Sequence, residues 1–107
     1  MSSWIPTQKS TTALVRFKLD GQKAHSKEEL FEATPYLVNP YHYGSRIAFD
    51  QSGYMYITLG DRYNYSTAST IDDPTQADAQ RLNSHWGKVL RLNLNGSVPS
   101  NNPYAQQ

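Results

Sequence analysis

Apolar and polar residues alternate with a period of two along several short runs of the chain, which is typical of β-strands with one covered face. In "ALVRFKLDG" (13–21), every second residue from Ala13 to Leu19 is apolar, and basic residues lie between them. The run ends in Asp-Gly, a common turn pair. The pattern predicts a half-buried strand followed by a turn.

The next segment, "SKEELFEATPYLV" (26–38), fits two kinds of element. Ser26 could cap a helix, with Glu29 three residues later completing a capping box. The segment is short, however, and Pro35 would interrupt the helix. We therefore predict a strand over residues 29–33.

Two apolar runs further along the chain predict a β-hairpin. "RIAFD" (46–50) and "YMYITLG" (54–60) are separated by the glycine-containing turn "QSG". Both faces of the expected hairpin are apolar, so it should lie in a stack of sheets. The predicted faces are Ile47, Phe49, Tyr54 and Tyr56 on one side, and Ala48, Met55, Ile57 and Leu59 on the other.

The remaining segments are polar except for one strand. Residues 62–86 read as a long polar loop, in which Asp72, Asp73 and Pro74 could begin a helix. "GKVLRLNLNG" (87–96) predicts a strand that ends in an Asn-Gly turn. We expect residues 1–12 to form a frayed polar arm and residues 97–107 a polar tail with nothing to pack against.

Composition narrows the possible functions. The chain has 107 residues, enough for one small domain, and a net charge of +1, which gives no electrostatic reason to bind nucleic acid or an anionic membrane. The absence of cysteine excludes disulfides, zinc thiolates and thiol catalysis. No apolar run approaches the roughly 20 residues that cross a bilayer, and "MSSWIPTQKSTT" lacks the features of a signal peptide.

His42 and Asp61 are the candidate catalytic pair. If Asp50 and Gly53 face each other across the hairpin turn, the same register brings His42 opposite Asp61. The carboxylate could then bond one ring nitrogen and leave the other as a general base. The alternative is a polar pair that closes the hairpin, with Asp61 bonding the backbone before Arg62.

Other polar residues offer weaker candidates. Arg46 could bind an anionic cofactor or pair with a carboxylate. His85, beside Trp86, is expected to pack, and His25 to lie on the surface. Four residues could supply oxygens to calcium, although their spacing matches no EF-hand loop: Asn64, Asp72, Asp73 and Asp78.

Two longer stretches carry a family resemblance. "HYGSRIAFDQSGYMYITLGDR" (42–62) and "GKVLRLNLNGSVPSNNP" (87–103) resemble the soluble PQQ-dependent glucose and aldose sugar dehydrogenases. "TTALVRFKLDG" (11–21) and "LFEATPYLVNPYHYG" (30–44) are also similar to that family. The resemblance therefore covers about residues 11–104, and its specificity lies in the combination of the motifs.

The resemblance implies a six-bladed β-propeller that binds PQQ and calcium and oxidises the C1 hydroxyl of an aldose to a lactone. His42 matches the histidine that removes the hydroxyl proton, and Asp61 the aspartate that orients it. Arg46 matches an arginine of the same motif and is the candidate cofactor-binding residue. Lys88 and Arg91 match the strand pattern, without an implied catalytic role. Family members are periplasmic or secreted.

The chain is much shorter than family members, which have several hundred residues. We expect an all-β fragment of the propeller, about one blade plus a strand: residues 13–38 as outer strands of one blade, and 42–96 as inner strands of the next. The family's PQQ-gripping arginine and asparagine and its calcium ligands match nothing in this chain. We therefore expect it to be inactive alone and to self-associate or to be completed by other blades. The alternative is a non-catalytic propeller-derived module or a truncated gene product.

Overall fold

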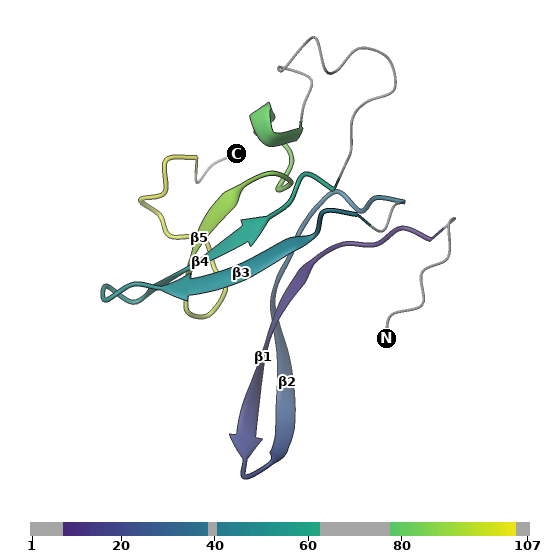
Figure 1. Cartoon of the computed structure of the whole chain (residues 1–107). Coiled ribbons are helices and arrows are strands. Elements are labelled where there is room, and N and C mark those ends of the chain that lie inside the picture. The colour runs from purple at the N-terminus through teal and green to yellow at the C-terminus, as the bar shows by residue number, and fades with distance from the viewer. Residues whose placement is uncertain (1–7, 39–40, 63–77, 105–107) are drawn as a thin grey trace.

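The computed structural model describes residues 8–38, 41–62 and 78–104, which form two antiparallel sheets (Figure 1). Strands β1 (Ala13–Asp20) and β2 (Lys23–Glu32) form a two-stranded ribbon. Strands β3 (Gly44–Phe49), β4 (Tyr54–Leu59) and β5 (Val89–Asn93) form a three-stranded sheet in that order. A 3-10 turn, η2 (Asp78–Gln80), precedes β5. The predicted all-β class is confirmed, and the described residues contain no α-helix.

The strand predicted at residues 29–33 is confirmed and is longer than expected. It begins at Lys23, so Ser26, the possible helix cap, lies within β2 with a φ of 55°. The possible helix start at residues 72–74 lies outside the described residues. No helix in the part of the chain that is described has the length and apolar character needed to cross a membrane.

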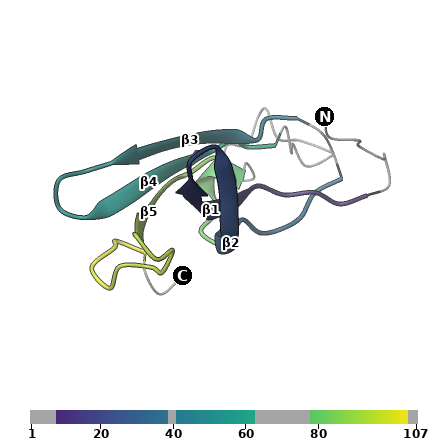
Figure 2. The same ribbon diagram turned by 90° about the horizontal axis from the view of Figure 1, so that it is seen from below.

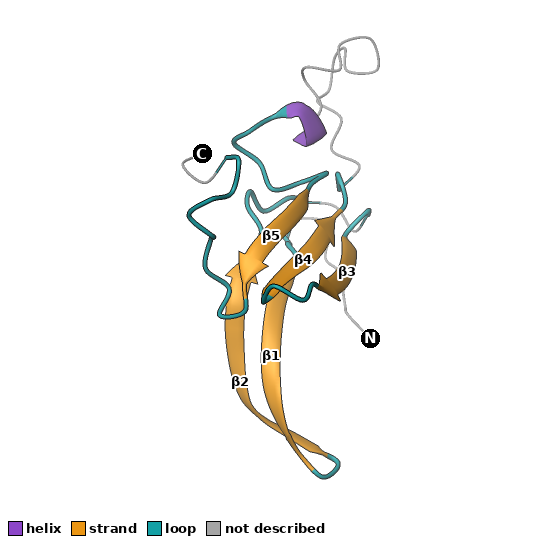
Figure 3. Cartoon of the chain, turned by 90° about the vertical axis from the view of Figure 1, so that its left-hand side faces the viewer, coloured by secondary structure: helices purple, strands orange, loops and turns teal. Residues whose placement is uncertain are grey.

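The prediction that β1 is half-buried along its length is wrong. Only Leu14 of this strand is buried, whereas Val15, Phe17 and Leu19 are exposed. The pairing with β2 is irregular after Leu14 and again after Arg16, and such irregularities rotate a strand about its axis. The far end of the ribbon also projects beyond the three-stranded sheet, so nothing in the described chain covers it (Figures 1 and 3).

The predicted faces of the β3–β4 hairpin are also wrong, because the register near the turn differs by one residue. Phe49 pairs with Met55 and Ile47 with Ile57, so these four side chains share a face. The cause is Asp50, whose backbone N–H donates to the carbonyl of Tyr54 at 3.1 Å. The Asp50 carboxylate also accepts the backbone N–H groups of Ser52 and Tyr54, which holds the turn in this register.

The core lies between one face of the three-stranded sheet and the near end of the ribbon. Leu14 of β1 packs with Met55, Ile57 and Leu92, and Leu30 and Phe31 of β2 cover the same cluster. A second cluster joins Ala33, Leu59 and Trp86. Figure 2, from below, shows the ribbon on one side of the β3–β4–β5 sheet. The opposite face of that sheet has no covering layer in the described residues.

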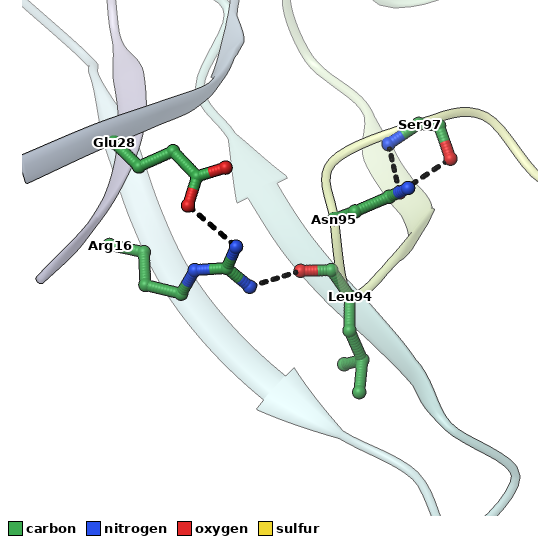
Figure 4. Close-up of polar contacts among 5 residues, drawn as sticks. All are labelled: Arg16, Glu28, Leu94, Asn95 and Ser97. Atoms are coloured by element: carbon green, nitrogen blue, oxygen red, sulfur yellow. Dashed lines mark hydrogen bonds and ion pairs between the residues drawn. The ribbon is translucent and has the colours of Figure 1, made fainter. Parts of the chain in front are cut away.

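Polar contacts fix the ribbon against the turn that follows β5 (Figure 4). Arg16 donates to the Glu28 carboxylate at 2.7 Å and to the Leu94 carbonyl at 3.1 Å. In the same turn, a side chain on Gly96 would place its Cβ 2.2 Å from the Leu30 carbonyl oxygen. Only glycine allows the turn to approach β2 this closely.

The segments on either side of the sheets are bonded, contrary to the prediction of a frayed arm and an unpacked tail. Ser10 and Leu37 form an antiparallel bridge through hydrogen bonds of 2.8 and 3.0 Å. At the other end, Pro99 is buried, and the Asn102 amide donates to the carbonyl of Arg91 at 2.9 Å. Backbone and side-chain amide groups outside the strands therefore find partners within the fold. Residues 1–7 and 105–107 lie outside the described residues.

Candidate functional site

His42 and Asp61 lie together at the open end of the β3–β4 hairpin. Nδ1 of His42 is 2.8 Å from Oδ1 of Asp61, a hydrogen-bonding distance. The two side chains are 52% and 36% exposed, so the pair lies at the surface of the described chain. The structure thus forms the contact that the sequence predicts for a histidine base and an orienting carboxylate.

A β-bulge between Gly44 and Ile47 brings this pair into register. Ile47 pairs with Ile57 and Gly44 with Leu59, so two residues of β3 oppose Thr58 alone. If the register near the turn continued unchanged, Tyr43 would lie opposite Asp61. The bulge removes the one-residue offset, and the pairing predicted for His42 is reached even though the predicted register near the turn is wrong.

The backbone around the pair is closely packed and unusual in conformation. His42 and Arg62 have φ values of 54° and 59°, in the left-handed region that most residues avoid. The N–H of Arg62 donates to the His42 carbonyl, and that of Gly60 to the Tyr43 carbonyl, both at 3.2 Å. A Cβ on Gly60 would lie only 2.0 Å from the His42 carbonyl oxygen. The strand end therefore requires glycine at this position.

The contact with Asp61 also determines which ring nitrogen of His42 can act as a base. A carboxylate accepts hydrogen bonds, so the neutral imidazole that donates to Asp61 carries its proton on Nδ1. The lone pair of Nε2 is then the basic site of the ring. This arrangement can accept a proton from a hydroxyl group while the carboxylate stabilises the resulting imidazolium.

Arg62, which follows Asp61, is a buried residue that sequence reasoning did not identify. Its side chain is fully buried, and burial lowers the pKa of its guanidinium from the ordinary value. The guanidinium lies 3.9 Å from the centre of the Tyr43 ring and 5.1 Å from that of Trp86. Tyr43 and Trp86 are distant from Arg62 in the sequence, so no local pattern indicates this cluster.

Arg46 stands in the bulge itself. Its backbone N–H donates to the Thr58 hydroxyl at 3.1 Å, and its side chain is exposed. In the described part of the chain, its guanidinium makes no ion pair or hydrogen bond. It borders a small cavity of about 50 Å³ between β3, β4 and the start of β1. Its role at a cofactor remains a prediction.

The predictions for the other two histidines agree with the structure. His85 packs edge-on against Phe31, with ring centres 4.9 Å apart, and its Nδ1 accepts the Thr34 N–H at 2.9 Å. Trp86 beside it is fully buried. His25 is exposed on the ribbon.

The two basic residues of the β5 motif have structural contacts. The Lys88 ammonium donates to the Trp86 carbonyl at 2.9 Å. Arg91 stacks on Tyr54, with its guanidinium 3.8 Å from the ring centre, and donates to the side chains of Asn101 and Asn102. Both basic residues therefore contribute hydrogen bonds and packing around β5.

The described residues hold no candidate metal centre. Nowhere in residues 8–38, 41–62 and 78–104 do three His, Cys, Asp or Glu side chains gather. Asn64, Asp72 and Asp73 lie outside the described residues, and the side chain of Asp78 is not described. A larger groove, about 360 Å³, runs along β5 and residues 98–104, and neither His42 nor Asp61 lines it.

Comparison with known proteins places this architecture in one family. The model of the glucose/sorbosone dehydrogenase family matches residues 2–107. The chain is 30% identical over 92 residues to aldose sugar dehydrogenase YliI of Escherichia coli, covering 86% of this chain and 22% of that protein. It is 34% identical over 70 residues to quinoprotein glucose dehydrogenase B of Acinetobacter calcoaceticus, covering 58% of this chain and 15% of that protein.

Solved structures give the same result. The soluble aldose sugar dehydrogenase of Escherichia coli in its apo-form matches with a TM-score of 0.76 and 29% identity, over 98% of this chain and 28% of that one. A glucose dehydrogenase crystal structure also matches with a TM-score of 0.76, over 97% of this chain and 28% of its own. The chain therefore spans only about a quarter of the length of these structures.

Proposed function

Because this chain belongs to the glucose/sorbosone dehydrogenase family, we propose that it supplies the general base of an aldose sugar dehydrogenase, with His42 as the base and Asp61 as its orienting carboxylate. The observation that carries the proposal is the 2.8 Å contact between His42 Nδ1 and Asp61 Oδ1 at an exposed strand end. The substrate class follows from the relatives, one named an aldose sugar dehydrogenase and another a glucose dehydrogenase.

In the proposed reaction, Nε2 of His42 accepts the proton of the sugar C1 hydroxyl. Asp61 holds the ring by its Nδ1–H and stabilises the imidazolium that forms. As the C1–O bond becomes a carbonyl, the C1–H bond breaks and its hydride passes to a two-electron acceptor, so that the sugar becomes a lactone. A bound PQQ quinone, when present, supplies the two-electron acceptor.

The described residues fit the proton-accepting half of this reaction and not a complete cofactor site. PQQ carries three carboxylates that require several cationic or amide partners. Arg46 is the one candidate contact for such a carboxylate that we assign, because the Arg62 guanidinium is buried against Ser10 and Tyr41. The remaining contacts, and the calcium ligands, would come from parts of a longer protein.

Nearly the whole chain aligns with a segment of its structural relatives, which supports assigning its strands to the matching part of their fold. We assign β1 and β2 to the outer strands of one propeller blade, and β3, β4 and β5 to the inner strands of the next. The His42–Asp61 pair then lies at the end of the inner hairpin of its blade. The compartment is expected to be the periplasm or the exterior, as the resemblance to the family implies.

A chimera tests this function. Residues 8–104 replace the matching segment of the Escherichia coli aldose sugar dehydrogenase, and PQQ-dependent oxidation of glucose is followed with an artificial electron-accepting dye. The chimera is expected to be active, and His42→Ala to lower kcat by about 10²- to 10⁴-fold, the usual contribution of a general base. His25→Ala is the matched control, because this histidine is exposed on the ribbon.

The result distinguishes catalysis from a purely structural role. If the chimera binds PQQ and His42→Ala retains full activity, His42 is not the base. If the chimera binds PQQ but does not oxidise aldoses even with His42 present, the chain is a non-catalytic module.

The isolated chain is expected to bind no PQQ at micromolar concentration, which a fluorescence titration measures directly.

A further inference from the structure

The buried guanidinium of Arg62 contacts the His42 segment on both sides of the histidine. Its Nε donates to the carbonyl of Tyr41 at 2.9 Å, and its Cζ lies over the ring of Tyr43, 3.9 Å from the ring centre. The backbone N–H of the same residue donates to the carbonyl of His42. Arg62 thus contacts three consecutive residues, and it is covalently joined to Asp61, the partner of the histidine.

The other end of the guanidinium is fixed to a distant part of the chain. Nη1 donates to the backbone carbonyl of Ser10 at 3.0 Å, and Nη2 to the Ser10 hydroxyl at 2.9 Å. The same hydroxyl lies 2.8 Å from that of Tyr43. Ser10 is itself fixed by its bridge with Leu37. The guanidinium is therefore held from two sides within the fold.

The two backbone segments on which His42 and Asp61 stand include conformations that must be held by neighbouring contacts. His42 and Arg62 have left-handed φ values, and each costs roughly 1–2 kcal/mol for a residue other than glycine. A conformation of this kind persists only where the surroundings determine it. The three contacts of Arg62 with residues 41–43 are part of the surroundings that hold the His42 backbone, and thereby direct its ring toward Asp61.

We propose that Arg62 is a positioning residue, which sets the conformation of residues 41–43 and so fixes His42 as an oriented base. This proposal deepens the function proposed above and rests on it for its catalytic meaning. Arg62 acts through the backbone and the Tyr43 ring, and does not touch the substrate. A guanidinium suits this role because its separate N–H groups can donate to Tyr41 and to Ser10 while its carbon lies over an aromatic ring.

The test follows the imidazole of His42 by ¹⁵N NMR in the 107-residue chain. In the unchanged chain we expect one dominant neutral tautomer, with the proton on Nδ1. Arg62→Met removes the guanidinium and all of its hydrogen-bond donors. In this variant we expect exchange between the two neutral tautomers of His42, while the dispersed amide spectrum of the sheets is retained. Arg91→Met is the matched control, because Arg91 also stacks on a tyrosine but contacts Asn101 and Asn102 instead.

Arg62→Lys makes the test decisive if the methionine variant does not fold. Lysine keeps the charge but replaces the fixed fork of separate donors with a single ammonium, so the His42 tautomer signal should again change, while His85 stays as in the unchanged chain. A folded Arg62 variant with an unchanged His42 signal overturns the proposal. So does failure of both Arg62 variants to fold while Arg91→Met folds, since Arg62 would then be a general determinant of the fold.

This readout does not depend on activity. A changed His42 tautomer together with an inactive chimera would retain Arg62 as the positioning residue and reject the proposed function. An unchanged His42 tautomer in the Arg62 variants, together with an active and His42-dependent chimera, would reject Arg62 as the positioning residue and retain the proposed function.

Discussion

Among single residues, His85 couples packing to protonation. Its Nδ1 accepts the backbone N–H of Thr34, which only an imidazole without a proton on that nitrogen can do. Desolvation by burial, and secondarily the charge of Lys88, lower the pKa of His85 from its ordinary value of 6.5. The folded chain therefore favours the neutral ring.

The sign of this shift predicts the pH dependence of stability. The unfolded chain binds a proton at His85 more readily than the folded chain does. The contribution of neutral His85 to the free energy of unfolding is therefore complete above pH 6.5, and it is lost as the pH falls through the lower pKa of the folded chain. His85→Gln can still accept the Thr34 N–H and does not titrate. We expect urea unfolding to show the unchanged chain losing stability relative to this variant on acidification. If the free energies of unfolding of the two proteins changed in parallel from pH 8 to about pH 5, a range that brackets the usual histidine pKa, the lowered pKa of His85 would be contradicted.

The single residues also show what sequence patterns can and cannot indicate. His42 and Asp61 were identified from strand register, because a hairpin brings residues equally far from its turn together. Arg62 was not, since its burial depends on Ser10, Tyr43 and Trp86, which are distant in sequence. No local period indicates that a charged side chain next to a polar motif is fully covered.

At the scale of the elements, the β3–β4 hairpin has different registers at its two ends. The Asp50 turn sets the register near Phe49, and the bulge at Ser45 and Arg46 shifts it by one residue before His42. The sequence predicted both strands, because their apolar runs and the intervening glycine are local signals. It did not predict the bulge, which depends on cross-strand contacts such as that between Arg46 and Thr58.

The close approach at the end of this hairpin gives a second prediction. In Gly60→Ala, the new Cβ would collide with the His42 carbonyl, so the strand ends must separate. We expect the free energy of unfolding to fall by about 1–3 kcal/mol, as for other overpacked sites, and the contact between His42 and Asp61 to be lost. Urea denaturation and the ¹⁵N signals of His42 measure the two effects.

Gly21→Ala is the control for this change. Its Cβ would meet no atom within 4 Å, and only its φ of 61° opposes the substitution. A cost of about 1–2 kcal/mol is therefore expected there from backbone strain alone, with the His42 signals unchanged. If both variants leave His42 unchanged, the glycine at position 60 is not what holds the strand ends together.

At the scale of the whole molecule, the described chain leaves large apolar side chains in solvent. Leu19 on the ribbon is 76% exposed, Phe49 at the hairpin turn 68%, and Val89 on the edge strand β5 69%. The sequence predicted that the hairpin needs cover on both faces, and the ribbon covers one. The structural relatives are much longer, and this chain covers 28% of each of them.

We therefore expect the isolated chain to self-associate as its concentration rises. Sedimentation velocity should show an increasing mean mass, and the combined change Leu19→Thr, Phe49→Thr and Val89→Thr should reduce it, because threonine keeps a high strand propensity. A monomer that unfolds cooperatively at every concentration tested would show that the two sheets are sufficient by themselves.

The link from Ser10 to Arg62 has a consequence for the lifetime of the site. Segments with few buried contacts open locally far more often than a whole domain unfolds. Residues 10–12 are held by the bridge to Leu37 and by bonds to Ala33 and Tyr43, and they in turn hold the guanidinium. Each time this short segment detaches, the arginine loses both Ser10 acceptors. The orientation of His42 would then last only as long as residues 10–12 stay bound to the rest of the fold. Amide hydrogen exchange at Ser10, whose N–H donates to the Leu37 carbonyl, would measure how often this segment detaches.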